Sequence, residues 1–208
     1  MRLDSLKTAP DRAGRYWAAF EDGTKMGLYR QTVEDFGLYS GKELSQEEME
    51  RLKTAAGRMS AKMRAVRIVS AASVSRQDLE ERLVRKGEDP LQAREAVQWM
   101  EDLRLVDDRA TAEQVVQSCV SKGYGLARAR QALYEKRIPR EYWEEVLEDY
   151  PDQTERSEAF LRFRLDPDSD EKQIRRAVDA LIRRGHSYSA VKRVLASLSF
   201  DTEDFLEE

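Results

Sequence analysis

A five-residue segment that begins with leucine, continues with basic residues and ends in glycine or, in one copy, arginine recurs at nearly fixed intervals along the chain. Its copies are residues 83–87, 133–137 and 181–185, and their leading leucines lie 50 and 48 residues apart. Around each copy, apolar residues recur at i, i+3, i+4 and i+7, the spacing of one face of an α-helix. A fixed period with shared core positions indicates tandem helical units, each packed mainly on its neighbours in an elongated and curved array.

We therefore predict a mainly α protein with three three-helix repeats, at residues 60–106, 107–151 and 152–200, followed by an acidic tail at 201–208. Polar residues that can cap helix N-termini precede many of the apolar stripes. The predicted caps are Ser75, Asp89, Asp108, Asp152 and Ser187, and Pro90 and Pro139 are predicted as first helical residues. The second repeat has Arg137 where the other two have glycine, so we expect its middle helix to continue to Ile138.

Residues 1–59 follow a different pattern and are predicted to form a small β-hairpin and helix extension. Two aromatic-rich runs, 15–20 and 25–30, flank an Asp22-Gly23 pair, which is typical of a hairpin turn. Because a lone hairpin is marginally stable in water, we expect a third strand near residues 3–7 and a supporting helix. That helix is predicted to begin at Ser45, with Glu48 completing a capping box.

Composition excludes several classes of site. The chain has one cysteine, Cys119, on an apolar helical stripe, and one histidine, His186, at a predicted helix end. These numbers leave no disulfide framework, cysteine-based zinc site or catalytic triad, and we expect Cys119 to be buried and His186 to be a capping or surface residue. We predict no enzyme activity, no cofactor and no metal site. The lone cysteine and the absence of an apolar leader favour the cytoplasm, and no stretch is apolar enough for a membrane span.

Several short motifs, in this order and spacing, resemble the RecX family of bacterial regulatory proteins. They include the leucine-basic-glycine closures at 83–87 and 181–185 and the Leu-x-Asp-Asp segment at 105–108. Gly123-Tyr124-Gly125 followed by Arg128 resembles the family's entry into a middle helix, and residues 37–44 resemble the N-terminal extension of its Gram-positive branch. The resemblance covers nearly the whole chain. The acidic tail and Arg137 depart from the family pattern.

The resemblance implies a regulator that binds the filament of the recombinase RecA. It further implies inhibition of ATP hydrolysis and strand exchange, in the context of DNA repair and the SOS response. Single- or double-stranded DNA is a further possible partner, and we expect the chain to act as a monomer without contact to a membrane.

Basic residues without an acid four positions away on the same predicted helix are the candidate binding residues. Arg82, Arg85, Arg175 and Arg183 each follow an acid by four residues and are interpreted as ion pairs of a solvated helix face. The remaining cations, with an aromatic among them, could hold phosphates, stack on a base or meet an acidic protein patch. These candidates are Lys86, Lys122, Arg128, Arg130, Tyr134, Lys136, Arg137, Arg184, Lys192 and Arg193.

Two other functions remain open from the sequence. Small helical units with exposed arginines often bind DNA directly, so the chain could be a nucleic-acid-binding repeat protein. It could also be an α-repeat scaffold for a protein partner unrelated to recombination. A net charge of −4 argues against a general DNA-coating protein, although residues 151–200 alone carry 10 basic and 8 acidic side chains.

Overall fold

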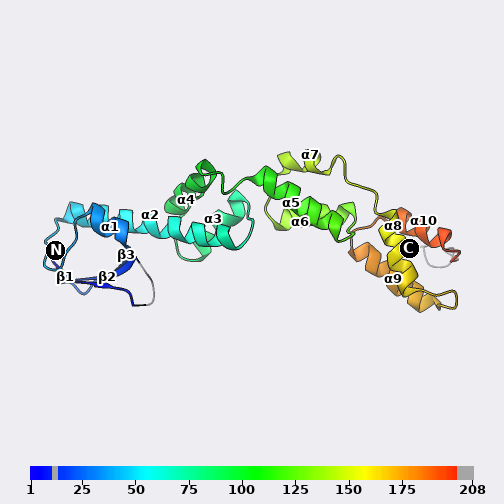
Figure 1. Ribbon diagram of the computed structural model, residues 1–208, viewed down its shortest axis with the longest axis horizontal. Helices are drawn as coiled ribbons and strands as arrows, with labels where there is room; N and C mark the ends of the chain where they lie inside the picture. The colour runs from blue at the N-terminus through cyan, green and yellow to red at the C-terminus, as the bar shows by residue number, and fades with distance from the viewer. Residues whose placement is uncertain (11–13, 201–208) are drawn as a thin grey trace. The chain divides into compact units, whose positions relative to one another are not determined.

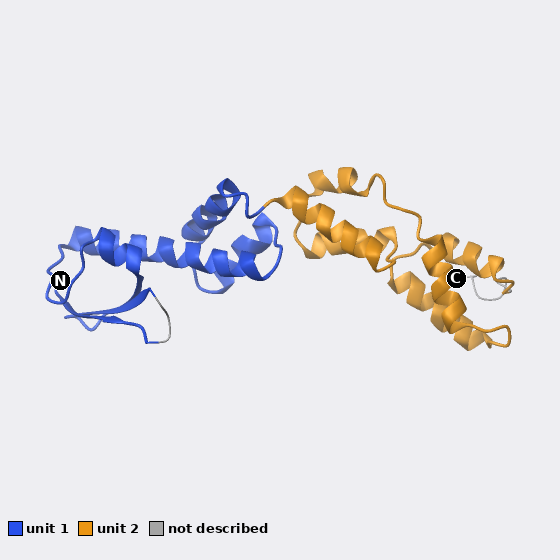
Figure 2. Ribbon diagram, viewed as in Figure 1, with its two compact units in different colours: residues 1–106 blue, residues 107–208 orange. Residues whose placement is uncertain are grey.

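The structure is a computed structural model that describes residues 1–10 and 14–200, so the predicted acidic tail at 201–208 lies outside the described part (Figure 1). The chain divides into two compact units, residues 1–106 and 107–208 (Figure 2). Mainly helical repeats follow a small N-terminal sheet, which confirms the predicted fold class. None of the described helices combines the length and the apolar character that crossing a membrane requires.

The first unit opens with an antiparallel sheet of three strands in the order β1-β2-β3. These are β1 (Leu3–Thr8), β2 (Arg15–Phe20) and β3 (Lys25–Tyr29), followed by the short helix α1 (Arg30–Asp35). The predicted hairpin and third strand are thereby confirmed. Gly23, at the hairpin turn, has a φ of 84°, which a glycine adopts without steric cost.

Helix α2 (Gln46–Ala71) serves two hydrophobic cores. It begins at the predicted capping box, in which Ser45 accepts from the Glu48 amide and the Glu48 carboxylate accepts from the Ser45 amide. The first half of the helix packs Met49 and Leu52 against the sheet, and the second half places Ala61 and Ala65 in the core of the first repeat. One continuous helix therefore crosses the predicted boundary between residues 59 and 60.

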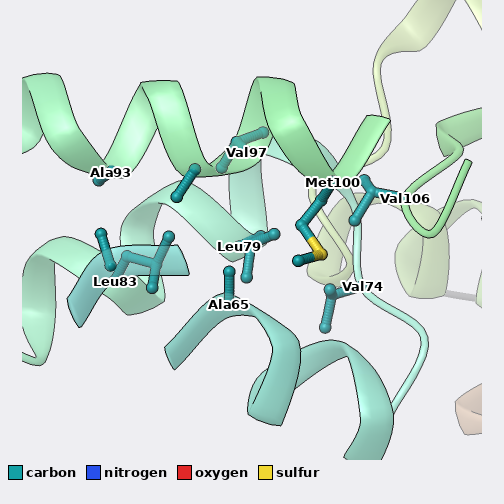
Figure 3. Close-up of a cluster of buried hydrophobic side chains, with 10 residues drawn as sticks. Ala65, Val74, Leu79, Leu83, Ala93, Val97, Met100 and Val106 are labelled. Carbon is teal, nitrogen blue, oxygen red and sulfur yellow. The ribbon is translucent and has the colours of Figure 1, made fainter. Parts of the chain in front are cut away.

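The first repeat is completed by α3 (Arg76–Arg85) and α4 (Pro90–Asp102). Figure 3 shows its core, where Leu79, Leu83 and Met100 meet the small side chains of α2. Ser75 and Asp89 cap the two helices, as predicted.

The second repeat contains α5 (Asp108–Ser121), α6 (Leu126–Glu135), the 3-10 turn η1 (Arg140–Tyr142) and α7 (Trp143–Leu147). Cys119 is buried in its core, as predicted. The predicted cap at Asp108 is wrong by one residue, because the Asp107 carboxylate accepts from the Ala110 amide while Asp108 is buried in the first turn. Pro139 is not a first helical residue but precedes η1 as its cap.

The third repeat contains α8 (Thr154–Arg164), α9 (Glu171–Arg183) and α10 (Tyr188–Ser197), which enclose a separate core. Ser187 caps α10, as predicted. The cap of α8 is Gln153 rather than Asp152, although the Asp152 carboxylate accepts from the amide and the hydroxyl of Thr154.

The middle helix of the second repeat ends at Glu135, so the predicted continuation to Ile138 is wrong. Arg137 adopts a left-handed conformation, with a φ of 57°, at the position where the other repeats have glycine. The Arg137 amide donates to the Tyr134 carbonyl and the Ile138 amide donates to the Leu133 carbonyl, which completes a Schellman turn. The turn directs Ile138 into the core, where it is 4% exposed.

Candidate binding surface

The second and third repeats meet through backbone rather than through long side chains. At the N-terminus of α6, the Gly125 and Ala127 amides donate to the Arg184 and Gly185 carbonyls at the end of α9, over 2.9 and 3.3 Å. These bonds pair helix-terminal amides with helix-terminal carbonyls, which neither helix can satisfy internally. The partial charges of the two helix ends are also complementary.

Two glycines permit this approach. A Cβ on Gly125 would lie 2.0 Å from the Gly185 carbonyl oxygen, and a Cβ on Gly185 would lie 2.2 Å from the Arg128 amide nitrogen. Both distances are far below a van der Waals contact. The atoms that a Cβ would meet belong to the backbone, so they cannot move aside without moving the whole segment. The residues that flank the junction are therefore held in a defined arrangement.

His186 links the same two repeats, contrary to the prediction that it caps a helix or lies on the surface. It is 8% exposed, with Nε2 3.0 Å from the Gly123 carbonyl oxygen and Nδ1 3.1 Å from the Ser157 hydroxyl. Because a carbonyl only accepts, Nε2 carries the proton and Nδ1 accepts from Ser157. Burial lowers the pKa of His186, with a smaller contribution from nearby Arg184, so the neutral ring is the native form.

Tyr150 and Arg156 add two further bonds around the junction. The Tyr150 hydroxyl donates to the Tyr124 carbonyl over 2.7 Å, and Arg156 Nη1 donates to the Ser121 carbonyl. Burial raises the pKa of Tyr150 to about 12. Both side chains hold the loop between α5 and α6, which carries Tyr124.

On one side of the junction lies a surface groove of about 330 Å³, which we name the Arg184 groove. The Arg184 guanidinium lies 5.7 Å from the centre of the Tyr124 ring and 4.9 Å from that of Phe160. Arg164 lies 4.6 Å from the same Phe160 ring. The lining contains four arginines and no acid: Tyr124, Arg128, Phe160, Arg164, Ala180, Arg183 and Arg184. Guanidinium groups stacked on aromatic rings keep their N–H donors directed outwards, which suits phosphate or carboxylate ligands.

A second groove, of about 550 Å³, lies around the N-termini of α6 and α10, and we name it the Arg130 groove. Its cations are Arg130 and Arg193, and it also contains Asp152, whose pKa is lowered mainly by bonds from Thr154. Arg128 and Arg130 enter different grooves because two residues are separated by about 200° around a helix axis.

The structure places four of the ten predicted binding residues in these grooves: Arg128 and Arg184 in one, Arg130 and Arg193 in the other. Arg128 also forms an ion pair with Glu135, with Nη1 2.9 Å from Oε1, a partner seven residues away. Five candidates lie outside both linings, namely Lys122, Tyr134, Lys136, Arg137 and Lys192. Lys86 is exposed at the end of α3 in the first unit.

Sequence reasoning missed Phe160, Arg164 and Arg183. Phe160 and Arg164 stand at i and i+4 on α8, and this aromatic-to-arginine spacing was the available signal. Arg183 was interpreted as a partner of Asp179 and set aside, yet it lines the Arg184 groove. In residues 1–10 and 14–200, no group of three or more His, Cys, Asp or Glu side chains is placed to hold a metal ion.

Comparison with known proteins identifies relatives over almost the full length. A family model described as RecX, second three-helix domain, matches residues 107–147. Regulatory protein RecX of Clostridioides difficile (strain 630) is 27% identical over 98% of this chain and 97% of the relative. Regulatory protein RecX of Chlorobaculum tepidum is 29% identical over 63% of this chain and 83% of the relative.

The chain is therefore similar to RecX proteins over nearly its whole length, and residues 107–147 match their second three-helix domain. A solved structure titled "Crystal structure of regulatory protein RecX" aligns with a TM-score of 0.62 and 20% identity, covering 94% of this chain and 98% of that one. RecX from Lactobacillus salivarius aligns with a TM-score of 0.60 and 20% identity, over 70% of this chain and 98% of that one. These RecX structures share the fold of this chain, and the RecX domain match begins at Asp107, the cap of α5.

Proposed function

We propose that this chain is a regulatory protein that binds the RecA filament and inhibits its ATPase and strand-exchange activities. Similarity to RecX proteins supports the regulatory role, since these curated relatives are named regulatory proteins. The observation that carries the binding proposal is the Arg184 groove, with four arginines beside two aromatic rings at a junction held by backbone bonds. DNA repair and the SOS response, in the cytoplasm, are the proposed context.

The geometry supports a polyanionic partner. The grooves on the two sides of the junction present cations on one scaffold, and a recombinase filament offers DNA phosphates and acidic protein side chains over a long surface. A preorganised cation lowers the entropic cost of binding and speeds association through electrostatic attraction. The other predicted candidates, including Lys86, Lys122 and Lys192, would extend the contact along the filament.

The test is a DNA-dependent ATPase and strand-exchange assay with the recombinase of the same organism. Wild-type protein at stoichiometric concentration is expected to lower both rates. The double variant Arg164→Ala and Arg184→Ala is expected to raise the half-inhibitory concentration about tenfold, because two guanidinium groups can no longer donate charge-assisted hydrogen bonds. The matched control is Arg162→Ala, which removes an exposed arginine of the same helix that pairs with Glu158. Unchanged rates with wild-type protein would refute the proposal.

Direct nucleic-acid binding is the second candidate function. It is favoured by the presence of Arg130 and Arg193 in the lining of the same groove. It predicts DNA affinity without recombinase and a steep loss of affinity with salt. Replacing Arg130 and Arg193 with alanine should then lower the salt slope by about one unit for each phosphate that the variant no longer neutralises. A flat salt response of the wild-type protein excludes this function.

A further inference from the structure

The outward face of the N-terminal sheet combines aromatic rings with cations. Strand register places Trp17 directly between Lys7 on β1 and Gly27 on β3. The adjacent Ala18 points to the opposite side and is buried in the core that α2 covers. Because side chains alternate along a strand, Trp17 and its two neighbours share the face that points away from α2.

The Trp17 ring reaches across this face to β3. A Cβ on Gly27 would be 3.4 Å from Cζ3 of the Trp17 ring, so the ring covers the bare backbone of β3. The Trp17 side chain is nevertheless 55% exposed. The indole therefore contacts the sheet while more than half of the residue remains open to solvent.

Arg15 and Tyr29 stand in the neighbouring row of the same face. The register pairs them across β2 and β3, and the Arg15 guanidinium lies 4.7 Å from the centre of the Tyr29 ring. Arg15 Nη2 is also 3.8 Å from the Cβ position of Gly27, next to the Trp17 ring. A planar cation and the Trp17 ring thus both lie close to Gly27 on this face.

The charges on this face are positive. The alternation of side chains along each strand places Lys7, Arg15 and Lys25 on this face. Asp4 is the only acidic residue within the three described strands. Asp4 pairs with Arg2 over 3.1 Å. In the hairpin turn, the Asp22 carboxylate is held by Thr24. An exposed aromatic ring surrounded by cations is complementary to an unpaired base and its flanking phosphates.

We propose that the outward face of this sheet binds single-stranded nucleic acid, with a base stacked on Trp17 and phosphates held by Lys7, Arg15 and Lys25. A duplex keeps its bases stacked on one another, so it cannot offer a base to the indole. Stacking is tolerant of sequence because every base has a π face. This site lies in the first unit, and its ligand binding requires neither the grooves of the second unit nor the recombinase.

The first measurement is the fluorescence anisotropy of a labelled oligo(dT) titrated with the full chain, without recombinase. Trp17→Ala is expected to weaken binding by about 5- to 100-fold, the range for loss of one base stack, whereas Trp17→Phe retains a stacking ring and most of the affinity. The matched control is Tyr39→Ala, which removes an aromatic of the same unit that is 63% exposed and lies outside the strands. Thermal unfolding of each variant checks that the fold is intact.

The second measurement is quenching of tryptophan fluorescence by the same unlabelled oligonucleotide. The chain has three tryptophans, of which Trp99 and Trp143 pack against repeat cores. Quenching is expected for the wild type and is expected to disappear in Trp17→Phe, even though that variant still binds. Replacing Lys7 and Lys25 with alanine should lower the salt slope by about 0.7 for each phosphate that is no longer neutralised.

Unchanged oligonucleotide affinity in Trp17→Ala would overturn the proposal, as would stronger binding of a duplex of equal length. So would a Trp17→Ala variant that loses inhibition of RecA but retains its oligonucleotide affinity, because the face would then contact protein. Loss of affinity only in the Arg164→Ala and Arg184→Ala variant would place the DNA site in the Arg184 groove and also refute it. Since recombinase is absent from these titrations, their result is independent of whether the chain inhibits RecA.

Discussion

Gly125 and Gly185 lie at a contact between two backbone segments that leaves no room for a side chain at either position. A Cβ on Gly125 would lie 2.0 Å from the carbonyl oxygen of Gly185. That carbonyl also accepts from the Ala127 amide, so it cannot turn away without losing a bond. The second and third repeats are therefore joined at a point where atoms of the backbone, and not of side chains, determine the fit.

The Gly185→Ala variant should be destabilised more than the Gly87→Ala variant. Gly185 has a φ of 86° and Gly87 has a φ of 88°, so alanine costs both positions a similar left-handed strain of about 1–2 kcal/mol. A Cβ at Gly87 would meet nothing within 4 Å, whereas one at Gly185 would meet the Arg128 amide. We expect Gly185→Ala to lower the free energy of unfolding by at least about 2 kcal/mol more than Gly87→Ala.

The measurement is urea unfolding of both variants, with hydrogen exchange by mass spectrometry to locate the effect in residues 107–200. Gly125→Ala provides a second test, because Gly125 has an ordinary φ of −78° and its substitution acts only through the steric clash. If Gly87→Ala and Gly185→Ala lose equal free energy of unfolding, the backbone at Gly185 packs less closely on α6 than the structure indicates.

Arg137→Gly should stabilise the second repeat relative to Arg137→Ala. Both variants remove the arginine side chain, but only glycine removes the cost of a left-handed φ of 57°. The expected difference in the free energy of unfolding is about 1 kcal/mol. Urea midpoints of the two variants measure it, and a difference near zero would mean that the strain is relieved elsewhere.

Arg137 also shows where sequence reasoning works and where it fails. Helix starts such as Ser45, Ser75 and Ser187 could be predicted because a cap depends on residues three positions apart. The end of α6 could not be predicted from the missing glycine. Burial of Ile138 in the core favours the turn, and a single left-handed arginine costs less than exposing an isoleucine.

The candidate site was predictable only in part, for a related reason. Arg128, Arg130 and Arg184 could be identified from the sequence because their own helices have no acid four residues away, but the same rule set aside Arg183, which lines the Arg184 groove. Which helix ends meet depends on tertiary packing, so the close approach of the two glycines and the buried His186 could not be foreseen. The same packing brings Arg164 of α8 to Arg184.

Tyr150→Phe should destabilise the second unit by about 1 kcal/mol, because the Tyr124 carbonyl loses the hydroxyl that donates to it over 2.7 Å. Burial raises the pKa of Tyr150 to about 12 from the ordinary value of 10.0. Burial also raises the pKa of Tyr142. An absorbance titration of the eight phenols should therefore include a late step near pH 12 that comes from Tyr150. This late step should be missing in Tyr150→Phe, and its persistence there would assign it to another tyrosine.

His186 should make the stability of the second unit depend on pH in the mildly acidic range. Its pKa is lowered from 6.5, mainly by burial, with Arg184 lowering it further and the Gly123 carbonyl and Asp152 opposing the shift. Below pH 6.5 His186 binds a proton in the unfolded chain, whereas in the folded chain it binds one only at lower pH. The stabilising contribution of the neutral ring is thus fully present above that pH and is lost as pH falls through the folded pKa.

Urea unfolding at about pH 8 and about pH 5.5 measures this dependence, in a range where most carboxylates remain ionised. We expect the wild-type midpoint to fall at the lower pH. His186→Gln is the matched variant, because an amide can still donate to Gly123 and accept from Ser157 but does not titrate. Its midpoint starts lower, since a buried ring is lost, but should change less between the two conditions. If the variant and the wild type lose equal stability on acidification, the titrating group is not His186. The assignment of a neutral His186 ring would then be wrong.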